Sequence, residues 1–270
     1  MILGFRRYVA LVPLLIGFPA VSVFAQSTDT TTRAQLFEAR DALAVVGLAG
    51  VVALVAQSDQ SVERSFTRSS LQNSSGLRNF SNASGFLGNP GSVILSAGLY
   101  FAGLGTHSRN LAALGMHTGE SVVLGGIIAE LLKSEIGRAR PSISPTDSRV
   151  FKTGKGFSSD SYRSLPSGET AVAFAAATAL SRGFSRDWPE HAGLMTAVGY
   201  TGATLVAGSR LYKNEHWASD VVAGAGLGTF SAIFVDRFNR RYPDNIFERV
   251  FLPASVTRYQ GGVAVEWRVR

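Results

Sequence analysis

A histidine and an aspartate four residues apart, with an arginine shortly before them, are the residues of this sequence best suited to chemistry. They lie in the run Ser209-Arg210-x5-His216-x3-Asp220. On a helix, this spacing places the imidazole over the carboxylate, and Arg210 adds a permanent cation beside them. Such a set of side chains is suited to attack on a phosphate. The simpler alternative is an exposed ion pair between neighbours on a helix surface.

Two further segments supply cations and a helix start. Lys133-x6-Arg140 provides an ammonium and a guanidinium, and the planar guanidinium can bind two phosphate oxygens at once. Ser167 and Gly168 follow a proline and are typical of a helix N-terminus, where a hydroxyl and backbone N–H groups attract anions and glycine allows close approach. Each segment also has an ordinary explanation, because cations favour helix C-termini and serine is a common N-cap.

In this order and at these separations, the three segments resemble the motifs of the type 2 phosphatidic acid phosphatase and vanadium haloperoxidase superfamily, over roughly residues 90 to 240. The resemblance implies that His216 attacks phosphorus to give a phosphohistidine, while Asp220 holds the other ring nitrogen of His216. It also implies that protein side chains bind the phosphate, so we expect no metal and no cofactor. The residues that it assigns to phosphate binding are Lys133, Arg140, Ser167, Gly168 and Arg210.

Residue 169 departs from the motif, because the superfamily usually has histidine after Pro-Ser-Gly and this chain has Glu169. In the superfamily, that histidine is the acid that protonates the leaving oxygen. Glutamic acid can take this catalytic role if burial and a nearby phosphate raise its pKa from about 4.3. Glu169 can equally be a structural acid that stabilises a helix start and pairs with Lys133. The sequence leaves both interpretations open.

Six apolar helical segments must position these side chains. Lys133, Ser167, Arg210 and His216 fall near the ends of four segments, and antiparallel neighbours would bring all four to one end of a bundle. The predicted fold class is therefore all-α: a six-helix bundle of the acid phosphatase/vanadium haloperoxidase type, with a short C-terminal β-like tail. The expected helices are roughly 34–56, 92–105, 111–132, 167–182, 192–208 and 216–236.

Four parts are expected along the chain. Residues 1–25 read as a secretory signal peptide, and 26–90 as an N-terminal helix and polar linker with a short surface helix. Residues 91–240 form the phosphatase-like helical core, and 241–270 form a tail that ends in a hairpin or one edge strand. Within the core, the connection 142–165 exceeds 20 residues, a length that usually marks a lid or binding loop.

The N-terminus predicts export. Arg6-Arg7 precedes an apolar stretch, and residues 23–25 provide a small-residue cleavage site; a retained membrane anchor is the alternative. We expect a periplasmic or membrane-associated protein whose active site faces the periplasm. Several apolar runs hold about 15 residues where a span needs about 20, so a soluble periplasmic bundle is the alternative to membrane association.

The composition favours an anionic partner. The chain has 270 residues, 46% of them hydrophobic, a formal net charge of +7 and no cysteine. This is enough apolar material for one sizeable core and excludes a disulfide framework or a cysteine-ligated zinc. Lys and Arg are scattered singly rather than interleaved with aromatic residues, so we expect no nucleic-acid partner. The expected partner is a phosphorylated lipid or a small phosphoester.

Three functions are compatible with these motifs. The leading hypothesis is an exported, metal-free phosphatase that hydrolyses a phosphomonoester or pyrophosphate through a phosphohistidine. The alternative is a catalytically impaired protein that binds a phosphate head group or has a structural role in the membrane, because Glu169 replaces the superfamily's acid. A vanadium haloperoxidase ranks third, since those relatives are generally larger and depend on the histidine that is missing here.

Overall fold

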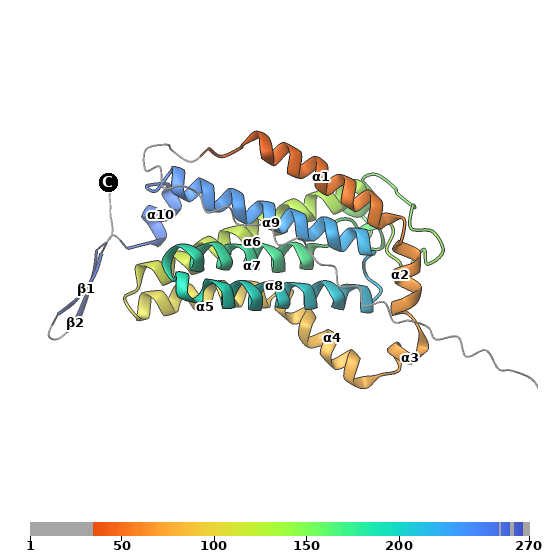
Figure 1. The fold of residues 1–270 in the computed structure, drawn as a ribbon, viewed down its shortest axis with the longest axis horizontal. Helices are drawn as coiled ribbons and strands as arrows, with labels where there is room; N and C mark the ends of the chain where they lie inside the picture. Colours follow the sequence, from red (N-terminus) through yellow and green to blue (C-terminus); the bar gives the residue numbers. More distant parts are fainter. Residues whose placement is uncertain (1–34, 254, 260–261, 267–270) are drawn as a thin grey trace, which may run out of the picture. The chain divides into compact units, whose positions relative to one another are not determined.

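A computed structural model describes residues 35–253, 255–259 and 262–266, and this part of the chain is almost entirely helical (Figure 1). The all-helical prediction is confirmed, and the predicted signal peptide, 1–25, lies outside the described residues. Six long helices correspond to the six expected segments. They are α1 (Ala39–Ala56), α5 (Gly91–Gly105), α6 (Arg109–Ile136), α7 (Gly168–Asp187), α8 (Pro189–Tyr212) and α9 (Ala218–Arg241).

Small residues allow α7 to pack at the centre of the bundle, against α6, α8 and α9. Much of the α7 core face is alanine, and Phe174 fills the space between α7, Val206 of α8 and Val221 of α9. On α9, Gly224 and Gly228 lie against backbone carbonyls of α7, where a Cβ would collide. These glycines set the close spacing of the two helices that carry the predicted site.

The segment expected to be a polar linker is instead folded onto the bundle. It contains α2 (Asp59–Phe66), α3 (Ser69–Gln72) and α4 (Ser75–Gly88). Serines and glycines of α4 are buried against α8, because small side chains let the two backbones approach. The described residues belong to one compact unit that includes these three helices.

The connection between α6 and α7 returns over the end of α6. Gly137 ends α6 in the left-handed conformation, with φ of 63°. Short 3-10 helices follow at η1 (Lys155–Phe157) and η2 (Asp160–Tyr162), and the Ser164 N–H donates to the Arg138 carbonyl at 3.1 Å. The connection is thus tied to the chain just after α6, beside the predicted site.

After α9, the chain forms the short helix α10 (Ile246–Phe251) and a two-stranded hairpin. Strands β1 (Ser255–Tyr259) and β2 (Gly262–Glu266) pair antiparallel, with Val256 opposite Val265. The predicted β-like tail is therefore a hairpin.

Within the described residues, three helices are long and apolar enough to cross a membrane: α1, α6 and α9, with 18, 28 and 24 residues. Helix α1 has no buried residue and exposes large apolar side chains, among them Leu43, Val46 and Leu54. Exposed apolar surface of this extent is typical of a contact with lipid or another protein. Helices α6 and α9 also run beyond the apolar segments predicted for them. The shortness of the predicted apolar runs therefore no longer argues against membrane spanning by these two helices.

Candidate active site

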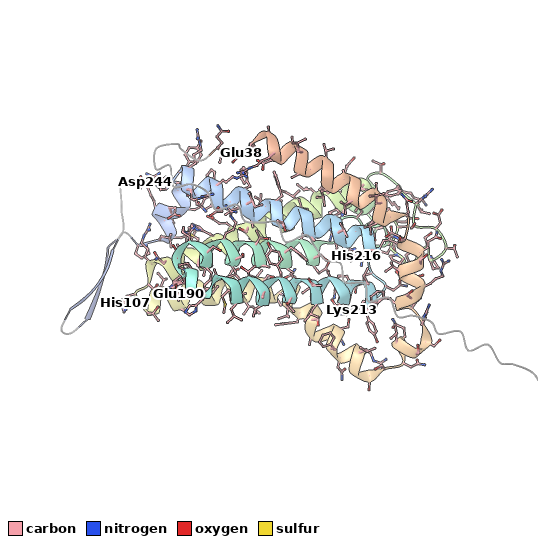
Figure 2. The ribbon with its side chains drawn as sticks, viewed as in Figure 1. Glu38, His107, Glu190, Lys213, His216 and Asp244 are labelled. Atoms are coloured by element: carbon pink, nitrogen blue, oxygen red, sulfur yellow. The ribbon has the colours of Figure 1, made fainter. Side chains whose placement is uncertain are left out.

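Four helix ends bring predicted residues to one end of the bundle. Lys133 lies in the last turn of α6, Ser167 is the N-cap of α7, Arg210 lies in the last turn of α8, and His216 precedes α9. Figure 2 shows His216 and Lys213 at this end, far from the end that carries His107 and Glu190.

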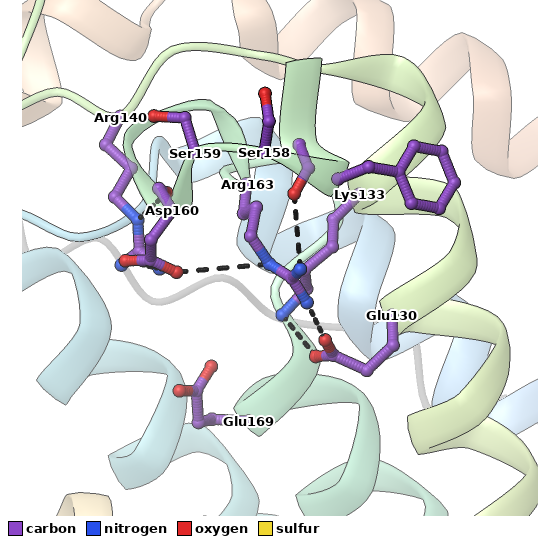
Figure 3. Close-up of a pocket in the computed structure, with 10 residues that line it drawn as sticks. Glu130, Lys133, Arg140, Ser158, Ser159, Asp160, Arg163 and Glu169 are labelled. Carbon is purple, nitrogen blue, oxygen red and sulfur yellow. Dashed lines mark hydrogen bonds and ion pairs between the residues drawn. The ribbon is translucent and has the colours of Figure 1, made fainter. Parts of the chain in front are cut away.

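A pocket of about 390 Å³ opens at this end of the bundle (Figure 3). Three predicted residues line it: Lys133, Arg140 and Glu169. The 142–165 connection supplies much of the remaining wall, as expected for a binding loop. The other residues that line the pocket are Glu130, Gly156, Phe157, Ser158, Ser159, Asp160 and Arg163.

Carboxylates accompany the cations predicted to bind phosphate. Because a carboxylate and a phosphate offer similar oxygens to a cation, these pairs mark positions where a phosphate can bind by exchange. The closest pairs are Lys133–Glu130 at 2.8 Å, Arg140–Asp160 at 3.0 Å and Arg210–Glu215 at 3.0 Å. Glu215 also lies 3.8 Å from Arg140, so this carboxylate connects Arg140 and Arg210.

Glu169 stands between the pocket and His216. One carboxylate oxygen lies 3.5 Å from Arg210 Nη1, and the other lies 3.5 Å from His216 Nε2 without a hydrogen bond to any described residue. Burial raises the pKa of Glu169, but the contact with His216 and the charge of Arg210 outweigh burial, so the pKa lies well below its usual range. Glu169 is therefore ionised in the resting site. The raised pKa required of a general acid is absent.

His216 and Asp220 do not stack as expected, because His216 precedes the first residue of α9. Asp220 turns back and accepts from the Trp217 N–H at 2.9 Å, so its oxygen lies 4.0 Å from His216 Nδ1, beyond hydrogen-bond distance. Nδ1 instead lies 2.7 Å from the carbonyl oxygen of Ser164. A carbonyl only accepts, so Nδ1 carries a proton and Nε2 is the nitrogen turned toward Glu169. The predicted contact of Asp220 with the ring is thus replaced by Ser164.

Ser167 also differs from its prediction. Its N–H donates to the Asp220 carbonyl at 3.0 Å, and its fully buried hydroxyl lies 2.9 Å from the Thr170 hydroxyl. Neither group faces the pocket in this state, so Ser167 caps and anchors α7. Gly168 does favour the site, because a Cβ there would lie 2.7 Å from Lys133 Nζ and would displace that ammonium.

Sequence reasoning missed a set of buried partners behind His216. Arg138 donates to Asp220 at 2.5 Å and to Asp59 at 2.7 Å, and it lies over the ring of Trp217. No sequence signal separates Arg138 from Arg140, because residues two apart on an extended chain point to the same side. No sequence signal marks Asp59, which lies in a Ser/Asn-rich stretch.

Comparison with known proteins supports the resemblance. Residues 114–242 match the model described as the PAP2 superfamily, which confirms the similarity to this superfamily. A curated relative, the lipid A 1-phosphatase of Porphyromonas gingivalis, is 33% identical over 144 residues. The match covers 50% of this chain and 26% of the relative, so the chain spans about a quarter of the relative's length.

Two solved structures align with this chain. A transmembrane PAP2-type phosphatidylglycerolphosphate phosphatase from Bacillus subtilis aligns with a TM-score of 0.49 at 19% identity, covering 75% of this chain and 98% of its own. Aquifex aeolicus LpxE aligns with a TM-score of 0.45 at 21% identity, covering 69% and 93%.

Proposed function

We propose that this protein is a membrane-associated phosphatase that hydrolyses a phosphomonoester or pyrophosphate of a lipid, through a phosphohistidine on His216 and without a metal ion. One observation carries the proposal. His216 Nε2 and Arg210 meet at Glu169, on the wall of a pocket that Lys133 and Arg140 also line. A nucleophile beside three fixed cations is what transfer of a phosphoryl group requires.

In the proposed reaction, the substrate phosphate first displaces the Glu169 carboxylate from Arg210 and His216. The guanidinium groups of Arg140 and Arg210 and the ammonium of Lys133 then neutralise the phosphate oxygens. His216 Nε2 forms a bond to phosphorus as the bond between phosphorus and the leaving oxygen breaks, and the departing oxygen takes a proton from water. Ser164 holds the Nδ1 proton, and a second water then attacks the phosphohistidine, which releases phosphate and restores Nε2. Because Glu169 is ionised at rest, we assign it the role of a counter-ion that the substrate replaces.

The lipid substrate is supported by the surface of the bundle and by the curated relative. Large apolar side chains are exposed on α5, α6 and α8 as well as on α1, which fits insertion into a bilayer. The relative's name specifies a phosphatase of lipid A, and this chain matches a quarter of it. A phosphorylated lipid can then enter the pocket from the membrane plane.

A second function is favoured by Glu169 itself. An ionised carboxylate at 3.5 Å from His216 Nε2 occupies the approach that phosphorus needs. If phosphate does not displace it productively, the protein binds phosphate head groups without turnover. Such a protein would retain a phosphorylated lipid during purification and release no phosphate from it.

Phosphate release by the purified protein distinguishes the two functions. The assay would use phosphorylated lipids in detergent, inorganic pyrophosphate and a soluble activated ester, each with and without EDTA. We expect turnover of at least one lipid phosphate, unaffected by EDTA. Strict dependence on an added divalent ion would contradict the metal-free reaction, and binding without release on every substrate would establish the binding protein instead.

A further inference from the structure

A buried chain of charged and polar groups connects α2 to His216. It begins at Asp59, the first residue of α2, whose side chain is fully buried. One oxygen of Asp59 accepts from the Ser219 N–H at 2.9 Å, and the other accepts from the Ser219 hydroxyl at 2.6 Å and from Arg138 at 2.7 Å. Asp59 lies outside the matched domain, which begins at residue 114.

Arg138 carries this chain to the predicted catalytic pair. Its guanidinium binds Asp59 through Nη2 and binds Asp220 through Nη1 at 2.5 Å, and it is 3% exposed. The Ser148 carbonyl accepts two further bonds, from Nε at 3.0 Å and Nη2 at 2.7 Å. A buried guanidinium held by two carboxylates and a carbonyl has little freedom to change its orientation.

Ser164 connects Asp220 to the imidazole. The Ser164 hydroxyl donates to Asp220 at 2.5 Å, and the Ser164 carbonyl accepts from His216 Nδ1 at 2.7 Å. The position of Asp220 therefore fixes Ser164, and Ser164 fixes both the tautomer and the plane of the His216 ring. The order of contacts is Asp59, Arg138, Asp220, Ser164 and His216.

We propose that Asp59 and Arg138 are positioning residues for His216, acting through Asp220 and Ser164 to keep Nδ1 protonated and Nε2 turned toward the pocket. The expected effect on turnover rests on the proposed function, whereas the orientation of the His216 ring does not. This positioning role makes the N-terminal segment before the matched region a part of the active-site framework. A misplacement of about 1 Å at a reacting group can cost on the order of 100-fold in rate.

A second, partly buried ion pair offers a matched control. Asp41 of α1 lies 2.5 Å from Arg237 of α9, and the two side chains are 12% and 9% exposed. This pair also joins an N-terminal helix to α9, but at the far end of α9 from His216. Asp41→Asn thus removes a comparable tether without a connection to the imidazole.

The first test compares Asp59→Asn with Asp41→Asn in the full-length protein. We expect both substitutions to lower the melting temperature. Only Asp59→Asn should lower kcat, by about 10- to 100-fold, with KM changed less than about threefold, because the phosphate-binding cations are untouched. Equal kcat in the two variants would show that Asp59 is a structural tether only.

The second test does not depend on turnover. Ring ¹⁵N chemical shifts of labelled histidine, recorded at pH 8.5 and assigned with His216→Asn, report which nitrogen of His216 carries the proton. We expect a single Nδ1–H tautomer in the wild type and in Asp41→Asn, and a mixture in Asp59→Asn. If the wild type releases no phosphate, the proposed function fails and this measurement still decides the positioning role.

Two milder variants cover the case in which Asp59→Asn does not fold. Arg138→Lys keeps the charge but loses the fork that reaches both carboxylates. Ser219→Ala removes only the hydroxyl that bonds Asp59 at 2.6 Å and Arg138 at 2.7 Å. Each should reduce kcat severalfold and broaden the tautomer population. Wild-type kcat with a single Nδ1–H tautomer in both variants would overturn the proposal.

Discussion

At the scale of single residues, His216 differs from a surface histidine because each ring nitrogen has a defined neighbour. Nδ1 donates to the Ser164 carbonyl and Nε2 faces Glu169, with the residue 2% exposed. Alanine at this position would leave the Ser164 carbonyl without a donor, and an unsatisfied buried carbonyl costs about 1–3 kcal/mol. A test of the nucleophile should therefore keep that hydrogen bond.

Asparagine at residue 216 separates chemistry from stability. Its amide N–H₂ can donate to Ser164 as Nδ1 does, but it lacks the second ring nitrogen. We expect His216→Asn to melt near the wild type and to lose phosphate release by roughly 10³-fold or more. His191→Asn is the control, because the His191 side chain is 61% exposed and lies in the first turn of α8, at the opposite end of that helix from Arg210. Near wild-type turnover of His216→Asn would exclude the phosphohistidine.

Glu169 should compete with anions in the pocket. Replacing its carboxylate by an amide removes a negative charge that lies 3.5 Å from both Arg210 and His216. We expect Glu169→Gln to bind vanadate, a phosphate mimic, about tenfold more tightly, which corresponds to about 1.4 kcal/mol. The measurement is the vanadate inhibition constant of the wild type and of Glu169→Gln, with Glu190→Gln as the control at an exposed position. Unchanged or weaker vanadate binding in Glu169→Gln would contradict the counter-ion role.

The pH dependence of this competition follows from the direction of the pKa shift. Because the pKa of Glu169 is lowered, the carboxylate stays ionised throughout the neutral range and becomes protonated only well below its ordinary pKa of about 4.5. The ratio of vanadate inhibition constants for wild type and Glu169→Gln should therefore be the same at pH 5.5 and pH 8. A ratio that approaches one at pH 5.5 would mean that Glu169 titrates there and can serve as an acid.

Leaving-group dependence distinguishes the counter-ion from a general acid. A counter-ion affects substrates with good and poor leaving groups alike, whereas an acid matters mainly when the departing oxygen needs a proton. We expect Glu169→Gln to change turnover of an activated ester and of a lipid phosphate by similar factors. A selective fall of about 10² to 10⁴ for the poor leaving group would show that Glu169 donates a proton once phosphate has displaced it.

At the scale of helices, apolar segments were sufficient to predict the six long helices of the described chain. Five of them bury residues against a neighbour, whereas α1 has no buried residue. The predicted segments also placed Lys133, Ser167 and Arg210 at helix ends that meet. Periodicity failed for α4, whose buried face consists of Ser81, Ser84, Gly85 and Gly88. Such residues resemble a linker in sequence, yet they permit the closest backbone contact.

The details of the site depend on contacts that spacing does not encode. His216 and Asp220 are four residues apart, but the helix starts between them and Asp220 becomes its cap. Asp59 joins the site from 160 residues away, through bonds to Ser219. A long-range hydrogen bond of this kind leaves no periodic pattern, so one sequence alone cannot show it.

The α7–α9 contact yields a prediction about stability. A Cβ at Gly228 would collide with the backbone of α7 at Ala171, whereas a Cβ at Gly202 of α8 meets no atom within 4 Å. Gly228→Ala should cost about 1–3 kcal/mol through overpacking, and Gly202→Ala should gain about 0.5–1 kcal/mol through helix propensity. Melting temperatures in detergent should move in opposite directions. Equal shifts would mean that helix spacing adjusts freely at Gly228.

At the scale of the whole molecule, the direction of α1 limits how the chain can cross a membrane. The start of α1 lies at the far end of α9, because Asp41 pairs with Arg237. The segment after α1 lies at the active-site end, because Asp59 bonds Ser219. If α1 crosses the bilayer, the chain before it and the active site are on opposite sides. A cleaved signal peptide and a periplasm-facing site are then incompatible.

Cysteine labelling decides which side the active site faces. The chain has no cysteine, so Ser158→Cys at the pocket and Ser185→Cys near the end of α7 each create one unique thiol. We expect a membrane-impermeant maleimide to label Ser158→Cys in spheroplasts and to label Ser185→Cys only after the membrane is permeabilised. If α1 crosses the bilayer, this result would mean that the chain enters α1 from the cytoplasm. The reverse labelling would place the pocket in the cytoplasm and contradict a periplasmic lipid substrate.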